Sequence, residues 1–122
     1  MNFSNIDVFP MGTTVNSQGV LEIGGCDIVS LSKTHGTPLY VYDENTIRNM
    51  ARTFVGEFTS RYSKTSVAYA SKAFLNLAMA KIATEENLSL DVVSGGEVAV
   101  ANAAGFPSSK MYFHGNNKTP QE

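Results

Sequence analysis

Apolar residues recur at helical spacing in two stretches of the chain, and each stretch is preceded by a short run of strand type. The first stripe follows Asp43, a typical helix N-cap, and the second ends near Asn87. The two stripes comprise Ile47, Met50, Ala51, Phe54 and Phe58, and then Leu75, Ala78, Met79, Ile82 and Ala83. We predict two amphipathic helices whose apolar stripes pack into a core.

Runs rich in β-branched and aromatic residues alternate with these helices and predict four strands. They lie at residues 39–42, 67–70, 88–93 and 110–114, with a further short helix at 98–104. Strand–helix–strand units of this length require parallel pairing. The fold class is therefore α/β, either a doubly wound sheet or the first units of a (β/α)8 barrel. No glycine-rich dinucleotide fingerprint follows the first strand, which disfavours a doubly wound nucleotide-binding sheet.

Residues 1–36 have a different pattern from the rest of the chain. Residues 20–23 and 27–29 read as short strands around a Gly24-Gly25 turn, as in a small antiparallel sheet. Residues 34–38 contain glycine and proline and predict a turn, with a boundary between segments 1–36 and 37–122. His35 lies in that turn, where we expect a solvated or capping role.

Two capping boxes stand in the second half of the chain. Ser94 and Glu97 form the first, ahead of the short helix that Gly105 closes. Residues 119–122 form the second, with Pro120 at the first helical position. This second box predicts a helix that starts at the last residues of the sequence. We therefore expect the chain to be the N-terminal portion of a longer protein.

Composition narrows the class of protein without identifying it. The 122 residues carry a net charge of −2 with 9 scattered Lys and Arg, so we expect no nucleic-acid or membrane-surface partner. No apolar run is long enough to span a membrane, and residues 1–10 do not read as a secretory signal. Cys26 is the single cysteine, which fits a reducing compartment. We therefore expect a cytoplasmic location.

Residues capable of chemistry gather at or after the carboxyl ends of successive predicted strands. They are Lys72, Asp91, Ser94, His114 and the loop residues Asn116, Asn117 and Lys118. In barrels this end of the sheet carries the active site. No zinc-ligand spacing, Ser-His-Asp set or pair of catalytic carboxylates stands out, and we expect no metal.

Lys72 has two interpretations on the residue pattern alone. It is either an ordinary lysine that extends to solvent, as most lysines do, or a Schiff-base lysine that holds pyridoxal phosphate. The second needs a neutral amine, which an apolar strand end would favour by lowering the lysine pKa. The small neighbours Ala70, Ser71 and Ala73 leave room for a flat ring.

The other polar residues also keep two interpretations. Asp91 is either bonded to backbone at its strand end or faces Lys72 across adjacent strands, where it would stabilise a positive charge. Ser94 is explained by capping alone, although its helix start could present amides to an anion. His114 is either structural or a hydrogen-bonding residue of the site.

Four ordered motifs together resemble the diaminopimelate decarboxylase family. They are Gly36–Asp43, Tyr69–Ala73, Asp91–Glu97 and His114–Lys118, and the resemblance extends from about residue 10 to the end. It implies an alanine-racemase-like fold, in which residues 1–36 contribute strands to a β-domain and residues 37–122 begin a pyridoxal-phosphate-binding (β/α)8 barrel.

The resemblance also implies a reaction and roles for three residues. Lys72 would be the catalytic lysine that holds the cofactor, with Asp91 and His114 beside it. The expected activity is decarboxylation of meso-diaminopimelate to L-lysine and carbon dioxide, the last step of lysine biosynthesis, in a homodimer with shared active sites. The family's other cofactor and substrate residues would lie beyond residue 122, so we expect this chain to be inactive alone.

Two alternatives share the same motifs. One is a decarboxylase of the same fold that acts on ornithine, arginine or carboxynorspermidine, because the residues that select the substrate lie mostly beyond residue 122. The other is a non-catalytic pyridoxal-phosphate-binding or regulatory protein. The strand-forming segment 1–36 and the presence of Lys72 disfavour this second alternative.

Overall fold

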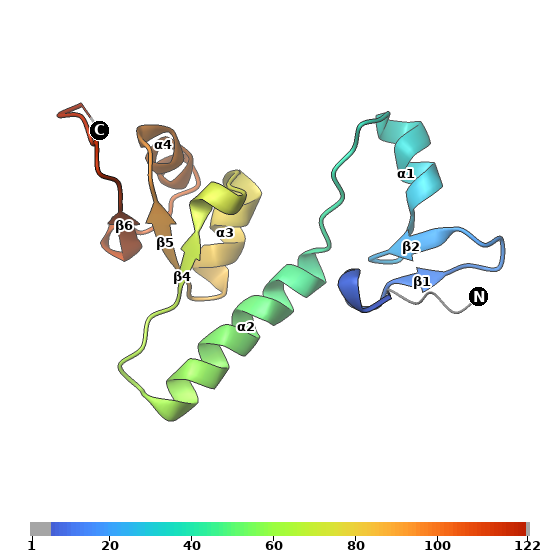
Figure 1. Cartoon of the computed structure of the whole chain (residues 1–122), viewed down its shortest axis with the longest axis horizontal. Helices are drawn as coiled ribbons and strands as arrows, with labels where there is room; N and C mark the ends of the chain where they lie inside the picture. Colours follow the sequence, from blue (N-terminus) through green and yellow to red (C-terminus); the bar gives the residue numbers. More distant parts are fainter. Residues whose placement is uncertain (1–5, 122) are drawn as a thin grey trace. The chain divides into compact units, whose positions relative to one another are not determined.

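The computed structural model describes residues 6–121, which fall into two compact units. The first unit extends to Asn49 and the second begins at Met50. The boundary lies inside a long helix, α2, which spans Glu44–Arg61 (Figure 1). The assignment of residues 1–36 to a β-domain and of residues 37–122 to a barrel stays a prediction.

The first unit is built on a small antiparallel sheet, as the sequence predicted. After a 3-10 turn η1 (Ile6–Val8), strands β1 (Thr14–Val15), β2 (Leu21–Ile23) and β3 (Cys26–Asp27) pair in the order β1-β2-β3. Gly24 and Gly25 form the tight turn between β2 and β3 at positive φ, 58° and 76°. Glycine adopts these angles readily because it has no Cβ.

The strand predicted at residues 27–29 is wrong beyond Asp27, the last residue of β3, because Ile28 begins helix α1 (Ile28–His35). His35 is the exposed last residue of α1, and the predicted turn follows it, with a bend at residues 37–38. Asp27 is the N-cap, and its carboxylate accepts a hydrogen bond from the Ser30 amide at 2.8 Å. Gly36 is the C-cap residue. A satisfied cap outweighs the strand propensity of two β-branched residues in the first turn.

The strand predicted at residues 39–42 is also wrong, because this segment carries no regular secondary structure. Its side chains are exposed, Tyr40 to 85%. Strand propensity gives a strand only where a neighbouring chain completes the hydrogen-bonded ladder. Within residues 6–121 no strand pairs with this segment.

Helix α2 begins where the sequence predicted but buries less of its apolar stripe. Asp43 Oδ1 accepts hydrogen bonds from the amide and the hydroxyl of Thr46, each at 2.6 Å. Ala51 is buried, whereas Met50, Phe54 and Phe58 are about half exposed (47%, 51% and 54%). The prediction that the whole stripe is core is therefore wrong for the described residues, because the hydrophobic cluster contacts only the side with Ala51 and Val55.

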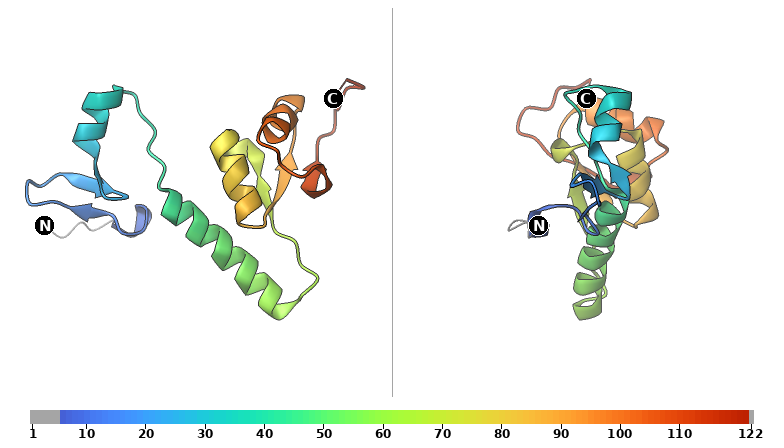
Figure 2. Two further views of the ribbon diagram at one scale, coloured as in Figure 1. Left: turned by 180° about the vertical axis from the view of Figure 1, so that it is seen from behind. Right: turned by 90° about the vertical axis from the view of Figure 1, so that its right-hand side faces the viewer.

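The second unit carries a parallel sheet of β4 (Ala68–Ala70), β5 (Ser89–Val92) and β6 (Met111–Phe113) in that order. Between the strands run η2 (Ser71–Ala73) with α3 (Leu77–Glu85), and then α4 (Gly95–Ala103) with η3 (Ser108–Lys110). Helices α3 and α4 lie side by side on the same face of the sheet (Figure 2). The alternation of strands and helices that the sequence predicted is confirmed in this unit.

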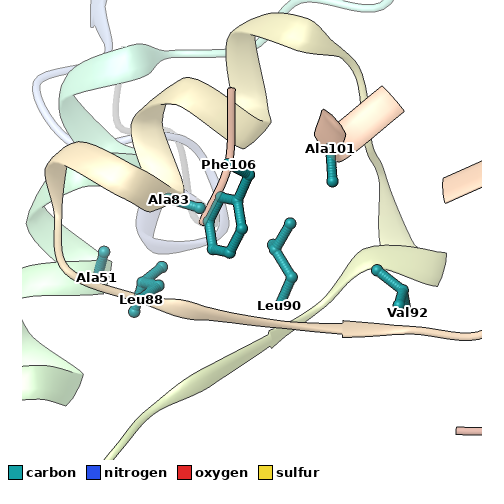
Figure 3. Close-up of a cluster of buried hydrophobic side chains, with 7 residues drawn as sticks. All are labelled: Ala51, Ala83, Leu88, Leu90, Val92, Ala101 and Phe106. Atoms are coloured by element: carbon teal, nitrogen blue, oxygen red, sulfur yellow. The ribbon is translucent and has the colours of Figure 1, made fainter. Parts of the chain in front are cut away.

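The core of this unit lies between the sheet and its helices (Figure 3). Leu88, Leu90 and Val92 alternate along the β5 segment and therefore project from one face of it. Leu90 and Val92 are fully buried, and Phe106 after α4 is 4% exposed. The cluster consists of Ala51, Ala83, Leu88, Leu90, Val92, Ala101 and Phe106.

The capping box predicted at Ser94 is confirmed. Ser94 Oγ accepts from the Glu97 amide at 3.3 Å, and Glu97 Oε2 accepts from the Val93 amide at 2.8 Å. Gly105 follows α4 with φ of 73°. The second box extends to Glu122, which lies outside the described residues; residues 120–121 form a turn. No helix in the described part of the chain is both long and apolar enough to cross a membrane.

Candidate functional site at the carboxyl ends of the parallel strands

Lys72 lies on the turn η2, directly after the carboxyl end of β4. Its side chain is exposed and makes no hydrogen bond or ion pair with another residue of the described range. The apolar enclosure that the sequence suggested for this lysine is therefore not formed by residues 6–121. The amine is accessible to a ligand that approaches this end of the sheet.

Strand alternation places Asp91 on the face of the sheet opposite the helices. Its neighbours Leu90 and Val92 are in the core, so the side chain of Asp91 projects the other way. In the register of the sheet Asp91 pairs with Ala70 on one side and with Tyr112 on the other. The alanine beside Asp91 keeps this face open next to the turn that carries Lys72.

Asp91 and His114 are brought together by the adjacent strands β5 and β6. Nδ1 of His114 lies 2.6 Å from Oδ1 of Asp91, and the His114 amide donates to the carbonyl of Val92 at 2.9 Å. Although close, the two side-chain atoms lack hydrogen-bond geometry, and Oδ1 is buried without a hydrogen-bond partner among the described residues. The carboxylate contacts His114 and not Lys72.

Ser71 and Tyr69 lie close to Lys72 in the sequence, which predicted a small neighbour at Ser71 but no hydrogen bond for either residue. Ser71 is 2% exposed, and its Oγ is buried without a hydrogen-bond partner in the described range. The Tyr69 hydroxyl donates to the carbonyl of Phe74 at 2.8 Å, across the turn that holds Lys72. No sequence signal marks this bond, because its acceptor is a backbone atom.

The remaining polar residues predicted for the site have local roles in the described structure. Ser94 caps α4. Lys118 Nζ donates to the carbonyl of Phe113 at 2.8 Å and lies 5.3 Å from the centre of the Phe113 ring. Asn116 and Asn117 are exposed in the loop after β6. No group of three or more His, Cys, Asp or Glu side chains among residues 6–121 could hold a metal ion.

The family model described as "Pyridoxal-dependent decarboxylase, pyridoxal binding domain" matches residues 44–122, more than half of the chain. The chain belongs to this family. The matched range includes the whole parallel sheet and all three residues of the candidate site.

Two curated relatives are named diaminopimelate decarboxylase. The diaminopimelate decarboxylase of Bacillus methanolicus is 57% identical over 112 residues, covering 91% of this chain and 26% of the relative. That of Bacillus subtilis (strain 168) is 56% identical, covering 88% and 24%. The chain thus spans about a quarter of the length of the relatives it matches.

Solved structures confirm the fold. Diaminopimelate decarboxylase from M. jannaschii is 33% identical, with a TM-score of 0.76 over 89% of this chain and 26% of that one. AQ1208 from Aquifex aeolicus is 32% identical, with a TM-score of 0.74 over 90% and 26%. The α/β fold of this chain is the alanine-racemase-like fold of the pyridoxal-phosphate-dependent decarboxylases.

Proposed function

We propose that this chain supplies the lysine-bearing part of a pyridoxal-phosphate-dependent decarboxylase that converts meso-diaminopimelate to L-lysine and carbon dioxide. The observation that carries the proposal is the position of Lys72, an exposed amine without a partner in the described range, at the carboxyl end of a parallel strand. The names of the relatives support the substrate, and one solved neighbour is described as a co-complex with L-lysine.

The residues present fit part of a pyridoxal phosphate site. Lys72 provides the amine, and the small side chains of Ala70 and Ala73 leave space for a flat ring beside it. Two buried oxygens have no hydrogen-bond partners in the described range: Ser71 Oγ on the turn η2 and Asp91 Oδ1 on the neighbouring strand β5. Unsatisfied buried acceptors are costly, so a polar ligand at this edge would lower the free energy of the site.

Lys72 is the covalent anchor in this proposal. Its Nζ would hold the cofactor through the aldehyde carbon, as catalytic lysines hold carbonyl groups. The bound cofactor would supply an electron sink for the bond between the substrate Cα and its carboxylate. Lys72 would hold the cofactor at the carboxyl end of β4, where the amine is accessible to a ligand.

Asp91 and His114 act as a pair beside this anchor. Oδ1 of the Asp91 carboxylate lies 2.6 Å from Nδ1 of His114, so the carboxylate limits where the imidazole ring can lie. His114 remains 70% exposed at its side chain, so Nε2 is available to a substrate group.

Three further features belong to this proposal. Residues 1–36 contribute strands to a β-domain, and residues 37–122 begin the barrel. The active form is a homodimer in the cytoplasm with an amino-acid substrate and no nucleic-acid partner. The 122 residues alone lack decarboxylase activity, since they span about a quarter of the relatives' length.

The test is to map the cofactor attachment in the protein as its gene encodes it. We expect borohydride reduction in the presence of pyridoxal phosphate to leave a pyridoxyl group on Lys72, detected by peptide mass spectrometry. Lys72→Ala removes the label, whereas Lys81→Ala, an exposed lysine on α3, retains it. A label on another lysine, or none, contradicts the proposal.

The substrate is tested separately by carbon dioxide release. We expect release from meso-diaminopimelate and none from ornithine, arginine or carboxynorspermidine. Release from one of the latter instead identifies a decarboxylase of the same fold with another substrate. A labelled Lys72 without release from any of them supports a non-catalytic pyridoxal-phosphate-binding protein.

A further inference from the structure

The turn that presents Lys72 is bridged by a side chain from the strand before it. Tyr69 lies in β4, and its register partner in β5 is the fully buried Leu90. The Tyr69 ring packs against the hydrophobic cluster on the helix side of the sheet. From there its hydroxyl donates a 2.8 Å hydrogen bond to the carbonyl of Phe74.

This hydrogen bond joins the two ends of η2, the three-residue turn that contains Lys72. Phe74 is the C-cap residue of η2 and has extended backbone angles, φ −171° and ψ 122°. Beyond it, the Asn76 side chain accepts from the Met79 amide at 2.8 Å and starts α3. The segment between β4 and α3 is thus held by Tyr69 within the turn and by Asn76 after it.

We propose that Tyr69 is a positioning residue for Lys72, acting through the Tyr69–Phe74 hydrogen bond. This inference rests on the proposed function, since it gives the fixed turn a catalytic purpose. The ring anchors the hydroxyl in the core, and the hydroxyl fixes the turn on which the amine is mounted. Tyr69 touches neither cofactor nor substrate, because it lies on the helix side of the sheet.

The Tyr69 hydroxyl stabilises the turn through its acceptor, the Phe74 carbonyl. When the hydroxyl is removed, the partly buried hydrogen bond to the Phe74 carbonyl is lost, and the turn leaves the conformation that this bond stabilises more often. A hydrogen bond of this kind changes an equilibrium roughly threefold to tenfold. The Lys72 amine then reaches its reactive orientation less often, which slows every step in which it attacks.

The experiment compares Tyr69→Phe with Tyr62→Phe in the protein as its gene encodes it. Tyr62 follows α2 and is 63% exposed, so its variant loses a hydroxyl far from the turn. Amide hydrogen exchange is measured in peptides that cover residues 71–75. The functional measurements are kcat and KM for decarboxylation and the rate of cofactor uptake at Lys72.

We expect Tyr69→Phe to raise exchange in residues 71–75 roughly threefold to tenfold and to lower kcat and the uptake rate by a similar factor. KM and the thermal midpoint should change little, and Tyr62→Phe should match the parent in every readout. Unchanged exchange in Tyr69→Phe overturns the inference, as does faster exchange with unchanged kcat and uptake rate.

The exchange readout separates failure of this inference from failure of the proposed function. If the parent takes up no cofactor at Lys72, the proposed function fails and Tyr69 has no catalytic purpose. If the parent is labelled and active but Tyr69→Phe equals it in kcat and uptake, only the positioning role fails.

Discussion

At the residue scale, the face of the sheet that each side chain occupies decides which residues can form a site. Alternation along β5 sends Leu90 and Val92 into the core and Asp91 to the opposite face. This placement follows from the sequence pattern, and so do the positions of Lys72 and His114 after their strands. The buried Ser71 oxygen and the Tyr69–Phe74 hydrogen bond do not, because they depend on the shape of a turn.

A pH prediction at this scale concerns Asp27, the N-cap of α1. The hydrogen bond from the Ser30 backbone amide lowers the pKa of the Asp27 carboxyl below its ordinary value of 3.8. The carboxylate therefore stabilises the folded helix start above pH 3.8, and this contribution is lost as pH falls through the lowered pKa. We expect the Ser30 amide to lose hydrogen-exchange protection in that window.

The matched variant is Asp27→Asn, which keeps a capping oxygen but does not titrate. In this variant, the hydrogen-exchange protection of the Ser30 amide should no longer depend on pH. NMR between about pH 5 and pH 2 covers the range in which a carboxyl of lowered pKa titrates. An identical pH profile in the variant would show that another group controls the start of α1.

At the element scale, periodicity predicted the helices and most strands of the second unit, because local caps and core patterns agree there. It failed for Ile28–His35 and for residues 39–42. The Asp27 cap overrode strand propensity in the first segment, and the second has no pairing partner among residues 6–121. Periodicity also could not say which side of α2 would be covered, since that depends on neighbouring elements.

Helices α2 and α3 are linked by a forked ion pair that gives a testable prediction. Arg52 Nε and Nη2 each donate at 2.7 Å to the carboxylate of Glu86, whose side chain is 6% exposed. Arg52→Ala removes both of these hydrogen bonds from the largely buried Glu86 carboxylate. Because Arg52 itself is 66% exposed, we expect a loss of only about 1 kcal/mol in the free energy of unfolding.

Arg61→Ala is the control for this change. Arg61 pairs with Glu57 within α2, and both side chains are more than 60% exposed. Its removal should cost less than about 0.5 kcal/mol. Urea denaturation of both variants measures the difference, and equal losses would mean that the link between α2 and α3 adds nothing beyond an exposed pair.

At the scale of the whole molecule, the candidate site depends on a small core between one sheet and its helices. Leu90 is fully buried at the centre of that core and next to Asp91. We expect Leu90→Ala to lower the free energy of unfolding by about 2–5 kcal/mol through lost burial and a residual cavity. Leu77→Ala, at a position 55% exposed, should change it far less, as measured by urea denaturation.

The parallel register of the second unit has a consequence for how the protein is made. Ala68 pairs with Ser89, and Leu90 with Met111, so each ladder closes after about twenty residues of intervening chain. Contacts this local can form once the later strand has left the ribosome, without pairing to more distant residues. Asp91 and His114 then come together, beside the turn that carries Lys72, as soon as β6 pairs with β5.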